Sequence, residues 1–249
     1  KILHLVPNFY PASGGVETYV YELSRRLVER GHDVAVITGN ILRFTNKKLK
    51  EFEVLHGIKV YRAPFKLIIR NIVSLSATKL LLDLDYDVLH IHTMGYFLDI
   101  VPLLKLVKNC KIVLSTHGGI FHTTKMKLLK NIYFHNIAKF SLKSVDYIIA
   151  HSKNDEELFS KISDSKKIKL ISYGIDWNNL SKIKPKGKMQ LIYIGRLSKN
   201  KRLDRLVNLL PYIKREIDDI KLTIVGEDWG QKKSLVELAK KLGIYKCFF

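Results

Sequence analysis

The chain has 249 residues, 47% apolar and 10% aromatic, which excludes wholesale disorder and suits one large domain or two smaller ones. No apolar run approaches the roughly 20 residues that a membrane-spanning helix needs, and nothing resembles a secretory leader. The formal net charge is +20, from 43 Lys and Arg against 23 Asp and Glu. The two cysteines, Cys110 and Cys247, lack disulfide or metal spacing, which predicts a reducing, cytoplasmic setting.

The excess of positive charge is uneven. Residues 100–145 contain no Asp or Glu but eight lysines, and residues 54–82 are also free of acids. Such a field attracts nucleic acid, an anionic membrane or a phosphorylated substrate. A lysine-rich solvated surface, common in heat-adapted proteins, explains the same pattern, so both interpretations stay open.

Short β-branched apolar runs alternate with amphipathic segments along the chain. The first such segment follows Gly15, has its apolar side chains on one face, and stops at Gly31. Further helices are expected at 201–217 and 231–242. This alternation predicts an α/β fold with a parallel sheet and right-handed crossovers. The expected strands are 2–6, 33–38, 58–63, 87–93, 111–117, 146–152, 167–172, 189–195 and 220–226.

A polar stretch with Pro185 and Gly187 separates two of these strands. It predicts an interdomain linker at 173–188, between a domain at 1–172 and a second domain at 189–249. The second domain holds only two strand–helix units, so we expect it to be incomplete.

Gly14 and Gly15 lie between the first strand and the first helix. There they either form a simple turn or let a phosphate or sugar approach the helix N-terminus, where N–H groups are unpaired. The pattern is not G-x-G-x-x-G, so no nicotinamide cofactor is indicated.

A second basic loop follows the strand that ends at Gly195. Arg196 comes next, and Lys201 is expected at the start of the following helix. A guanidinium and an ammonium at this spacing could bind a pyrophosphate, helped by the helix dipole, although a basic loop is also ordinary in a basic protein.

The order of these segments resembles the family 4 (group 1) glycosyltransferases of the GT-B fold. That resemblance implies two Rossmann-like domains facing a cleft, with the nucleotide sugar bound mainly to the second domain and the acceptor to the first. The segments that carry it are 14–38, "DVLHIHT" (87–93), "IVLSTHG" (112–118), 146–159, "LISYGID" (170–176), 193–207 and "LTIVGEDWG" (222–230).

The resemblance also implies residue roles. His117 would contact the transferred sugar, and Arg196 and Lys201 would bind the diphosphate and stabilise its charge as it leaves. Gly14 and Gly15 would lie against the donor phosphate or the acceptor. The other positions assigned to donor or acceptor binding are Ser152, Gly195 and Gly226.

The chain departs from the family pattern at three places. Tyr173 stands where the family usually has Asn, and Arg202 where it has Gly. The family's two glutamates spaced E-x7-E, which hold the donor's sugar and ribose, would lie beyond Phe249, so we expect this chain to be weakly active or inactive.

Several local patterns have simpler alternatives. His117 could be an ordinary hydrogen-bonded loop histidine. His90 and His92 share a strand face but lack a Cys, Asp or Glu partner at ligand spacing, so no metal is expected. Asp83 and Asp85 precede a strand, which fits a turn. The helix expected at 123–144, with Met126, Leu129, Ile132, Tyr133, Ile137 and Phe140 on its apolar side, would pack on the core or lie on an anionic membrane.

Together with this resemblance, the sequence predicts a metal-independent glycosyltransferase that needs no cofactor and uses a nucleotide-diphosphate sugar, and the resemblance implies that the reaction is retaining. The acceptor would be a glycan or a lipid-linked hydroxyl, with peripheral contact at the inner membrane surface. The alternatives are a GT-B sugar-nucleotide epimerase and a non-catalytic basic module that binds a membrane or another polyanion. Nucleic acid ranks last, because interleaved surface aromatics and RNA motifs are missing.

Overall fold

The protein divides into two compact units in a computed structural model, Lys1–Gly174 (unit 1) and Ile175–Phe249 (unit 2). Each unit is described by itself. The predicted linker at 173–188 lies mostly outside the described residues, so its bounds stay a prediction. The structure describes residues 1–42, 45, 47–68, 71–118, 126–175, 177, 190–217 and 219–245.

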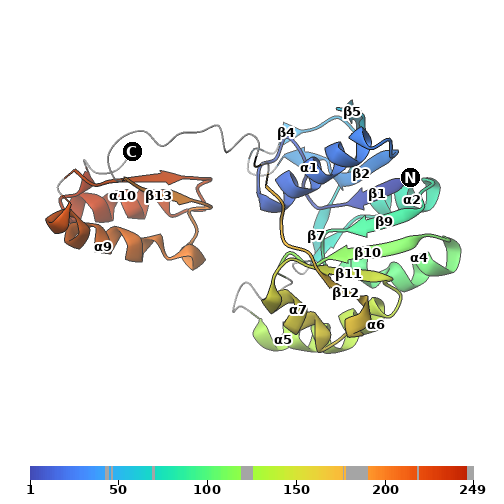
Figure 1. Ribbon diagram of the computed structural model, residues 1–249. Coiled ribbons are helices and arrows are strands. Elements are labelled where there is room, and N and C mark those ends of the chain that lie inside the picture. The colour runs from blue at the N-terminus through green and yellow to red at the C-terminus, as the bar shows by residue number, and fades with distance from the viewer. Residues whose placement is uncertain are drawn as a thin grey trace. The chain divides into compact units, whose positions relative to one another are not determined.

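Unit 1 is built on an eight-stranded sheet (Figure 1). Every neighbouring pair is parallel except β5 and β6 at one edge. In spatial order the strands are β12 (Ile168–Leu170), β11 (Tyr147–Ala150), β10 (Lys111–Ser115), β9 (Val88–Ile91), β1 (Ile2–Leu5), β2 (Val34–Gly39), β6 (Ile58–Ala63) and β5 (Phe52–Leu55).

Helices cover both faces of this sheet. On β2, Val34 and Val36 pack toward α1 (Gly15–Glu29), whereas Ile37 belongs to the larger core on the opposite face. That core also holds Leu81 of α2 (Leu75–Asp83). The other helical segments of the unit are α3 (Tyr96–Asp99), α4 (Val101–Val107), α5 (Lys127–Tyr133), the π-helical η1 (Phe134–Ala138), α6 (Lys139–Leu142), α7 (Lys153–Ser160) and the 3₁₀ turn η2 (Ser165–Lys167).

Two short antiparallel ribbons complete unit 1. They pair β3 (Ile41–Leu42) with β4 (Lys47–Lys48), and β7 (Lys66–Ile68) with β8 (Asn71–Val73). The sequence predicted neither the ribbons nor β5. All nine predicted strands form, and the predicted α/β fold class is confirmed.

The helix expected at 123–144 packs differently from the prediction. Residues 123–125 lie outside the described part. The helical run extends from Lys127 to Leu142 and contains a π-helical turn at Phe134–Ala138. The predicted core side chains of Leu129, Ile132, Ile137 and Phe140 are more than half exposed. Phe134, Ala138 and Leu142 are buried instead, so the core-packing interpretation of the predicted apolar side is wrong for the four exposed residues, and the membrane alternative stays a prediction.

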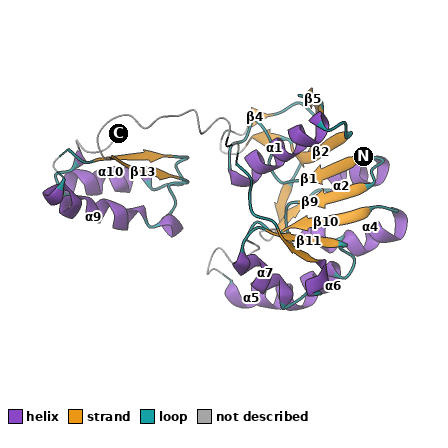
Figure 2. Cartoon of the chain, viewed as in Figure 1, coloured by secondary structure: helices purple, strands orange, loops and turns teal. Residues whose placement is uncertain are grey.

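Unit 2 has two parallel strands, β13 (Gln190–Ile194) and β14 (Lys221–Val225), with helices α9 (Leu203–Glu216) and α10 (Lys232–Lys241) (Figure 2). Leu191 and Leu222 pair in register and belong to the core formed with both helices. Ile192 and Ile194 alternate with the core residues and are 64% and 75% exposed. In the described part of unit 2, therefore, the helices pack on one face of the sheet.

Gly226 is a position where the fold of unit 2 requires glycine. Its φ is 152°, and a Cβ there would lie 1.9 Å from the carbonyl oxygen of Gly195. The two glycines thus bring the loops after β13 and β14 into contact.

We predict that Gly226→Ala destabilises unit 2 by about 3 kcal/mol or more, because backbone clash adds to backbone strain. Gly230→Ala is the matched control, since Gly230 also has a positive φ but an added Cβ would meet nothing within 4 Å. It should cost only about 1–2 kcal/mol, the price of the left-handed conformation. Denaturant unfolding followed by tryptophan fluorescence measures both changes, and equal losses would contradict the packing argument.

Candidate functional site

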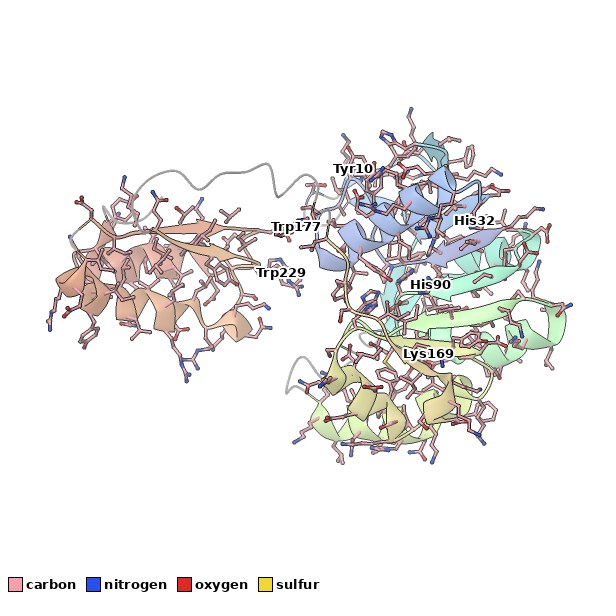
Figure 3. The ribbon with its side chains drawn as sticks, viewed as in Figure 1. Tyr10, His32, His90, Lys169, Trp177 and Trp229 are labelled. Carbon is pink, nitrogen blue, oxygen red and sulfur yellow. The ribbon has the colours of Figure 1, made fainter. Side chains whose placement is uncertain are left out.

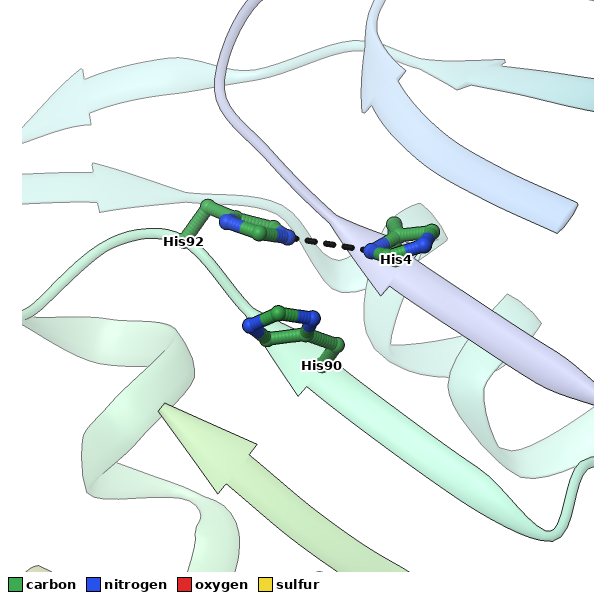
Figure 4. A group of neighbouring side chains, drawn as sticks. All are labelled: His4, His90 and His92. Carbon is green, nitrogen blue, oxygen red and sulfur yellow. Dashed lines mark hydrogen bonds between the residues drawn. The ribbon is translucent and has the colours of Figure 1, made fainter. Parts of the chain in front are cut away.

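Four histidines lie at the carboxyl ends of the central strands, on the face covered by α1. His4 of β1 is in register with His90 of β9, so both side chains point to the same face. His92 follows two residues later and returns to that face. All three are buried, and Figure 4 shows their rings lying close together. His117, two residues beyond Ser115 of β10, continues the row.

Hydrogen bonds join these rings in series. Nδ1 of His4 lies 3.0 Å from Nε2 of His92, and Nδ1 of His92 lies 3.0 Å from Nε2 of His117. Nδ1 of His117 then lies 2.7 Å from the hydroxyl of Tyr173. We call His4, His92, His117 and Tyr173 the histidine chain. It runs from a fully buried residue to one that is 47% exposed.

Tyr19 and His151 enclose the outer half of the histidine chain. The ring of Tyr19, one turn into α1, makes edge contacts with His92, His117 and Tyr173 at 5.2–6.0 Å between centroids. His151 stacks on Tyr173 at 4.2 Å and donates from Nδ1 to the carbonyl oxygen of Ile171, 2.9 Å away. The site is therefore a compact aromatic cluster that uses residues of β1 and α1 and of the segments that follow β9, β10, β11 and β12.

A buried carboxylate holds the loop that carries His117. Asp155 accepts hydrogen bonds from Thr116 Oγ1 at 2.8 Å and from the backbone N–H of Gly118 at 3.2 Å. His117 itself has a φ of 45°, which is uncommon for a residue with a side chain. Ser152 accepts from the backbone N–H of Asp155 and begins α7 as its N-cap. Ser152 thus has a structural contact; its predicted binding role stays a prediction.

Burial keeps these histidines neutral. It lowers the pKa of His4 to about 4 and that of His117 to about 3. It also lowers the pKa values of His90 and His92 well below 6.5, with smaller contributions from the neighbouring histidines. The pKa of Tyr173 is raised to about 12, mainly by burial. At neutral pH the cluster is a set of uncharged donors and acceptors.

Among the residues that the structure describes, His4, His90 and His92 form a group that could hold a metal ion. Their ligand nitrogens lie within 4.8 Å of one another. The group contains no carboxylate or thiolate, and nitrogens of His4 and His92 already share a hydrogen bond. His90 bonds Ser115 Oγ at 2.8 Å. A metal bound by all three rings would have to displace a hydrogen bond of His92, both of whose ring nitrogens are already used, so the set as it stands fits a metal poorly.

The glycines at the start of α1 are not required by the chain's own packing. Gly14 has a φ of 173°, which is extended backbone open to any residue, and a Cβ on Gly15 would meet nothing within 4 Å. A Cβ on Gly14 would meet the carboxylate of Glu17. A role in ligand approach remains a prediction for both glycines.

In unit 2 the predicted basic residues follow the carboxyl ends of the strands. The guanidinium carbon of Arg196 lies 4.7 Å from the ring centroid of Trp229, which Figure 3 shows at the end of the sheet. Lys201 ends a 3₁₀ turn, Lys199–Lys201, and α9 begins only at Leu203, after Arg202 with a φ of 51°. Lys201 thus precedes the helix and does not start it as expected. Arg196 and Lys201 are both exposed.

Sequence reasoning identified His117 but missed most of its neighbours. His4, Tyr19, Tyr173 and His151 were not assigned to the site, and His92 was considered only as a metal ligand. One signal was present: the strands at 2–6, 87–93, 111–117 and 146–152 all carry histidine at or near their carboxyl ends. Parallel strands place such residues at one edge of a sheet.

The chain matches two family profiles along almost its whole length. The profile of "Glycosyltransferase Family 4" matches residues 13–178, and that of "Glycosyl transferases group 1" matches residues 177–249. It is 28% identical over 235 residues to the GDP-mannose:cellobiosyl-diphosphopolyprenol alpha-mannosyltransferase of Xanthomonas campestris, covering 92% of this chain and 60% of that protein. It is 23% identical to the phosphatidylinositol N-acetylglucosaminyltransferase GPI3 subunit of Saccharomyces cerevisiae, covering 91% of this chain and 53% of the subunit.

Solved glycosyltransferases share the fold. WaaG, a glycosyltransferase involved in lipopolysaccharide biosynthesis, matches with a TM-score of 0.66 at 13% identity, covering 100% of this chain and 69% of WaaG. The catalytic domain of starch synthase IV from Arabidopsis thaliana matches with a TM-score of 0.64 at 12% identity, covering 99% and 73%. The chain spans about 60% of the length of the mannosyltransferase that it matches.

We predict that unit 1 loses stability as the pH falls below 6.5. The histidines titrate near 6.5 when unfolded but only at about 4 for His4 and about 3 for His117 when folded, so the unfolded state takes up more protons. Each such histidine lowers the free energy of unfolding by about 1.4 kcal/mol per pH unit in that window. Urea unfolding followed by far-UV circular dichroism at pH 7 and pH 5 measures the loss.

Two variants test the assignment. His4→Phe should reduce the pH slope by about one proton, whereas His32→Gln, at an exposed position, should leave it unchanged. A slope equally altered by both, or a wild-type stability that is constant from pH 7 to 5, would contradict the buried neutral state.

Proposed function

Because the chain belongs to Glycosyltransferase Family 4, we propose that it is part of an enzyme that moves a sugar from a nucleotide-diphosphate donor to a hydroxyl acceptor. The observation that carries the proposal is the consecutive match of two glycosyltransferase profiles over residues 13–178 and 177–249. The curated relatives include mannosyl- and N-acetylglucosaminyltransferases, and their names include GDP-mannose as a donor.

In this proposal the loops at the ends of β13 and β14 receive the diphosphate. Arg196 stacks on Trp229, and stacking holds a guanidinium in a plane from which its N–H groups can meet phosphate oxygens edge-on. Lys201 adds a point charge. Gly195 and Gly226 carry no side chain that would keep a ligand away from the backbone. These groups would stabilise the charge that the leaving diphosphate gains, without a required metal.

Unit 1 would contact the sugar and the acceptor. His117 and the hydroxyl of Tyr173 are uncharged at neutral pH and bonded to each other at 2.7 Å. Neutral donors suit sugar hydroxyls, whose oxygens both donate and accept. We take the reaction to be retaining, as in the family that the sequence resembles. Because both ring nitrogens of His117 are already bonded, His117 would orient the sugar through the Tyr173 hydroxyl and would not carry a proton.

We also propose that the acceptor is lipid-linked and that α5, η1 and α6 contact the membrane. Leu128, Leu129, Ile132, Ile137 and Phe140 are 51–74% exposed on this helical run. Lys127, Lys139 and Lys143 lie among and beside them, and residues 100–145 contain no acid. An apolar surface with flanking lysines fits an anionic lipid interface. Two relatives are named for a diphosphopolyprenol and a phosphatidylinositol substrate. No helix among the described residues has the length and apolar character needed to cross a membrane.

The donor site predicts a loss of nucleotide affinity on mutation. Replacing both Arg196 and Lys201 by Ala should weaken binding of GDP and UDP by tenfold or more, because each charge-assisted bond to phosphate contributes about 1.5–3 kcal/mol. Lys199→Ala is the matched control, an exposed lysine from the same turn. Isothermal titration calorimetry measures all three proteins.

The control should bind as the wild type does, apart from a small change common to any lost surface charge. An equal loss in Lys199→Ala would indicate nonspecific attraction by the +20 chain. Unchanged binding by the double variant would contradict the assigned diphosphate site.

The membrane surface predicts vesicle binding. The chain should co-sediment with vesicles of phosphatidylglycerol and phosphatidylcholine, and less with phosphatidylcholine alone, because lysines add about 1 kcal/mol each near an anionic surface. Leu128→Glu combined with Ile132→Glu and Phe140→Glu should abolish most of the binding. Leu106→Glu is the control, since Leu106 is 81% exposed but lies on α4. Equal loss in the control, or no loss in the triple variant, would contradict the surface.

A further inference from the structure

The histidine chain has a direction. His92 and His117 each use both ring nitrogens in the series, and His4 uses Nδ1 alone. A neutral imidazole has one N–H donor and one bare acceptor nitrogen. One proton therefore has to sit at each link, and the position chosen by one ring determines the position in the next.

Only two arrangements satisfy every link. In the outward arrangement His4, His92 and His117 all carry the proton on Nδ1, and His117 donates to the oxygen of Tyr173. In the inward arrangement all three carry it on Nε2, and Tyr173 donates to His117. Because the bonded nitrogens alternate in the same order at each link, mixed tautomers would leave two donors or two acceptors face to face.

The buried end of the chain decides between the two. His4 is fully buried, and its Nε2 has no hydrogen-bond partner within the described part of the chain. The inward arrangement would place an N–H group there without an acceptor, and buried N–H groups without partners are rarer than unpaired acceptors. Tyr173 is 47% exposed, so its hydroxyl can meet water in either arrangement.

We propose that His4 and His92 are positioning residues that fix His117 as its Nδ1–H tautomer, so that the histidine chain donates outward to Tyr173 and leaves the Tyr173 O–H to bind an oxygen of the sugar or acceptor. The assignment of that ligand rests on the proposed function. The direction of the chain does not, since it follows from the bonds of unit 1. The ligand recognised is a neutral hydroxyl or ether oxygen.

Nitrogen-15 NMR of histidine-labelled protein tests the direction. Long-range couplings show which ring nitrogen carries the proton. His151 is an internal reference, because its Nδ1 donates to the carbonyl oxygen of Ile171 and must be protonated. His4, His92 and His117 should show the same pattern as His151 at pH 7. A proton on Nε2 of any of the three would overturn the proposal.

Variants test whether His92 sets the state of His117. His92→Phe removes both bonds at similar volume, and His117 should then become a mixture of tautomers. His90→Phe is the control, since His90 is also buried two residues earlier but is bonded to Ser115 outside the series. It should leave His117 unchanged. An unchanged His117 in His92→Phe would overturn the positioning role.

Two further measurements keep the result clear. Tyr173→Phe, at a partly exposed position, should fold and leave the proton of His117 on Nδ1. If the inward arrangement held instead, loss of the Tyr173 donor would move the proton of His117 from Nε2 to Nδ1.

Added Zn²⁺ should leave the histidine signals in place. Stoichiometric binding of Zn²⁺ to His4, His90 and His92 would overturn the proposed histidine chain. None of these readouts needs a nucleotide, so loss of the diphosphate site and loss of the histidine chain are separate outcomes.

Discussion

The side-chain alternation of parallel strands is the constraint on which the site depends. β1, β9 and β10 are neighbours in register, so every second residue of each strand faces α1. Toward the carboxyl ends these positions are occupied by His4, His90, His92 and Ser115, whereas at the start of β1 and β9 the same face carries Ile2 and Val88. Buried imidazoles need hydrogen-bond partners, and neighbouring strands supply them.

The hydrogen bonds that the histidine rings make to one another hold the cluster rigid. A ring bonded at both nitrogens, as His92 is, cannot rotate without losing two hydrogen bonds. Asp155 adds a second restraint, since it ties the loop of His117 to α7 through Thr116 and Gly118. His117 is thereby held in a left-handed backbone conformation that a free loop would seldom choose. The position of His117, near the exposed end of the histidine chain, is therefore determined by the buried residues His92 and Asp155.

The strands and the fold class were predictable because buried parallel strands leave continuous apolar runs in the sequence. The cluster was not, because it depends on which strands are neighbours. His90 and His92 looked unpartnered among residues close in sequence, while His4, 86 residues before His90, lies beside it on β1. The core-packing interpretation of the α5–α6 face was wrong for a related reason: a π-helical turn changes the periodicity after Tyr133 and moves Phe134 and Ala138 inward.

The two units differ in the kind of chemistry that they can offer. Unit 1 presents imidazoles that burial keeps neutral, and unit 2 presents exposed cations after its strands. A neutral donor binds a sugar oxygen without attracting the phosphates that a charged histidine would also hold. A guanidinium supported by an indole is suited to the opposite task, since its charge remains at any physiological pH. A histidine of ordinary pKa would be partly protonated near neutral pH, and would then attract phosphate as the cations of unit 2 do. If unit 1 handles the sugar, as we propose, burial of His4 and His92 beneath α1 would contribute to selectivity, because it keeps charge out of the histidine chain.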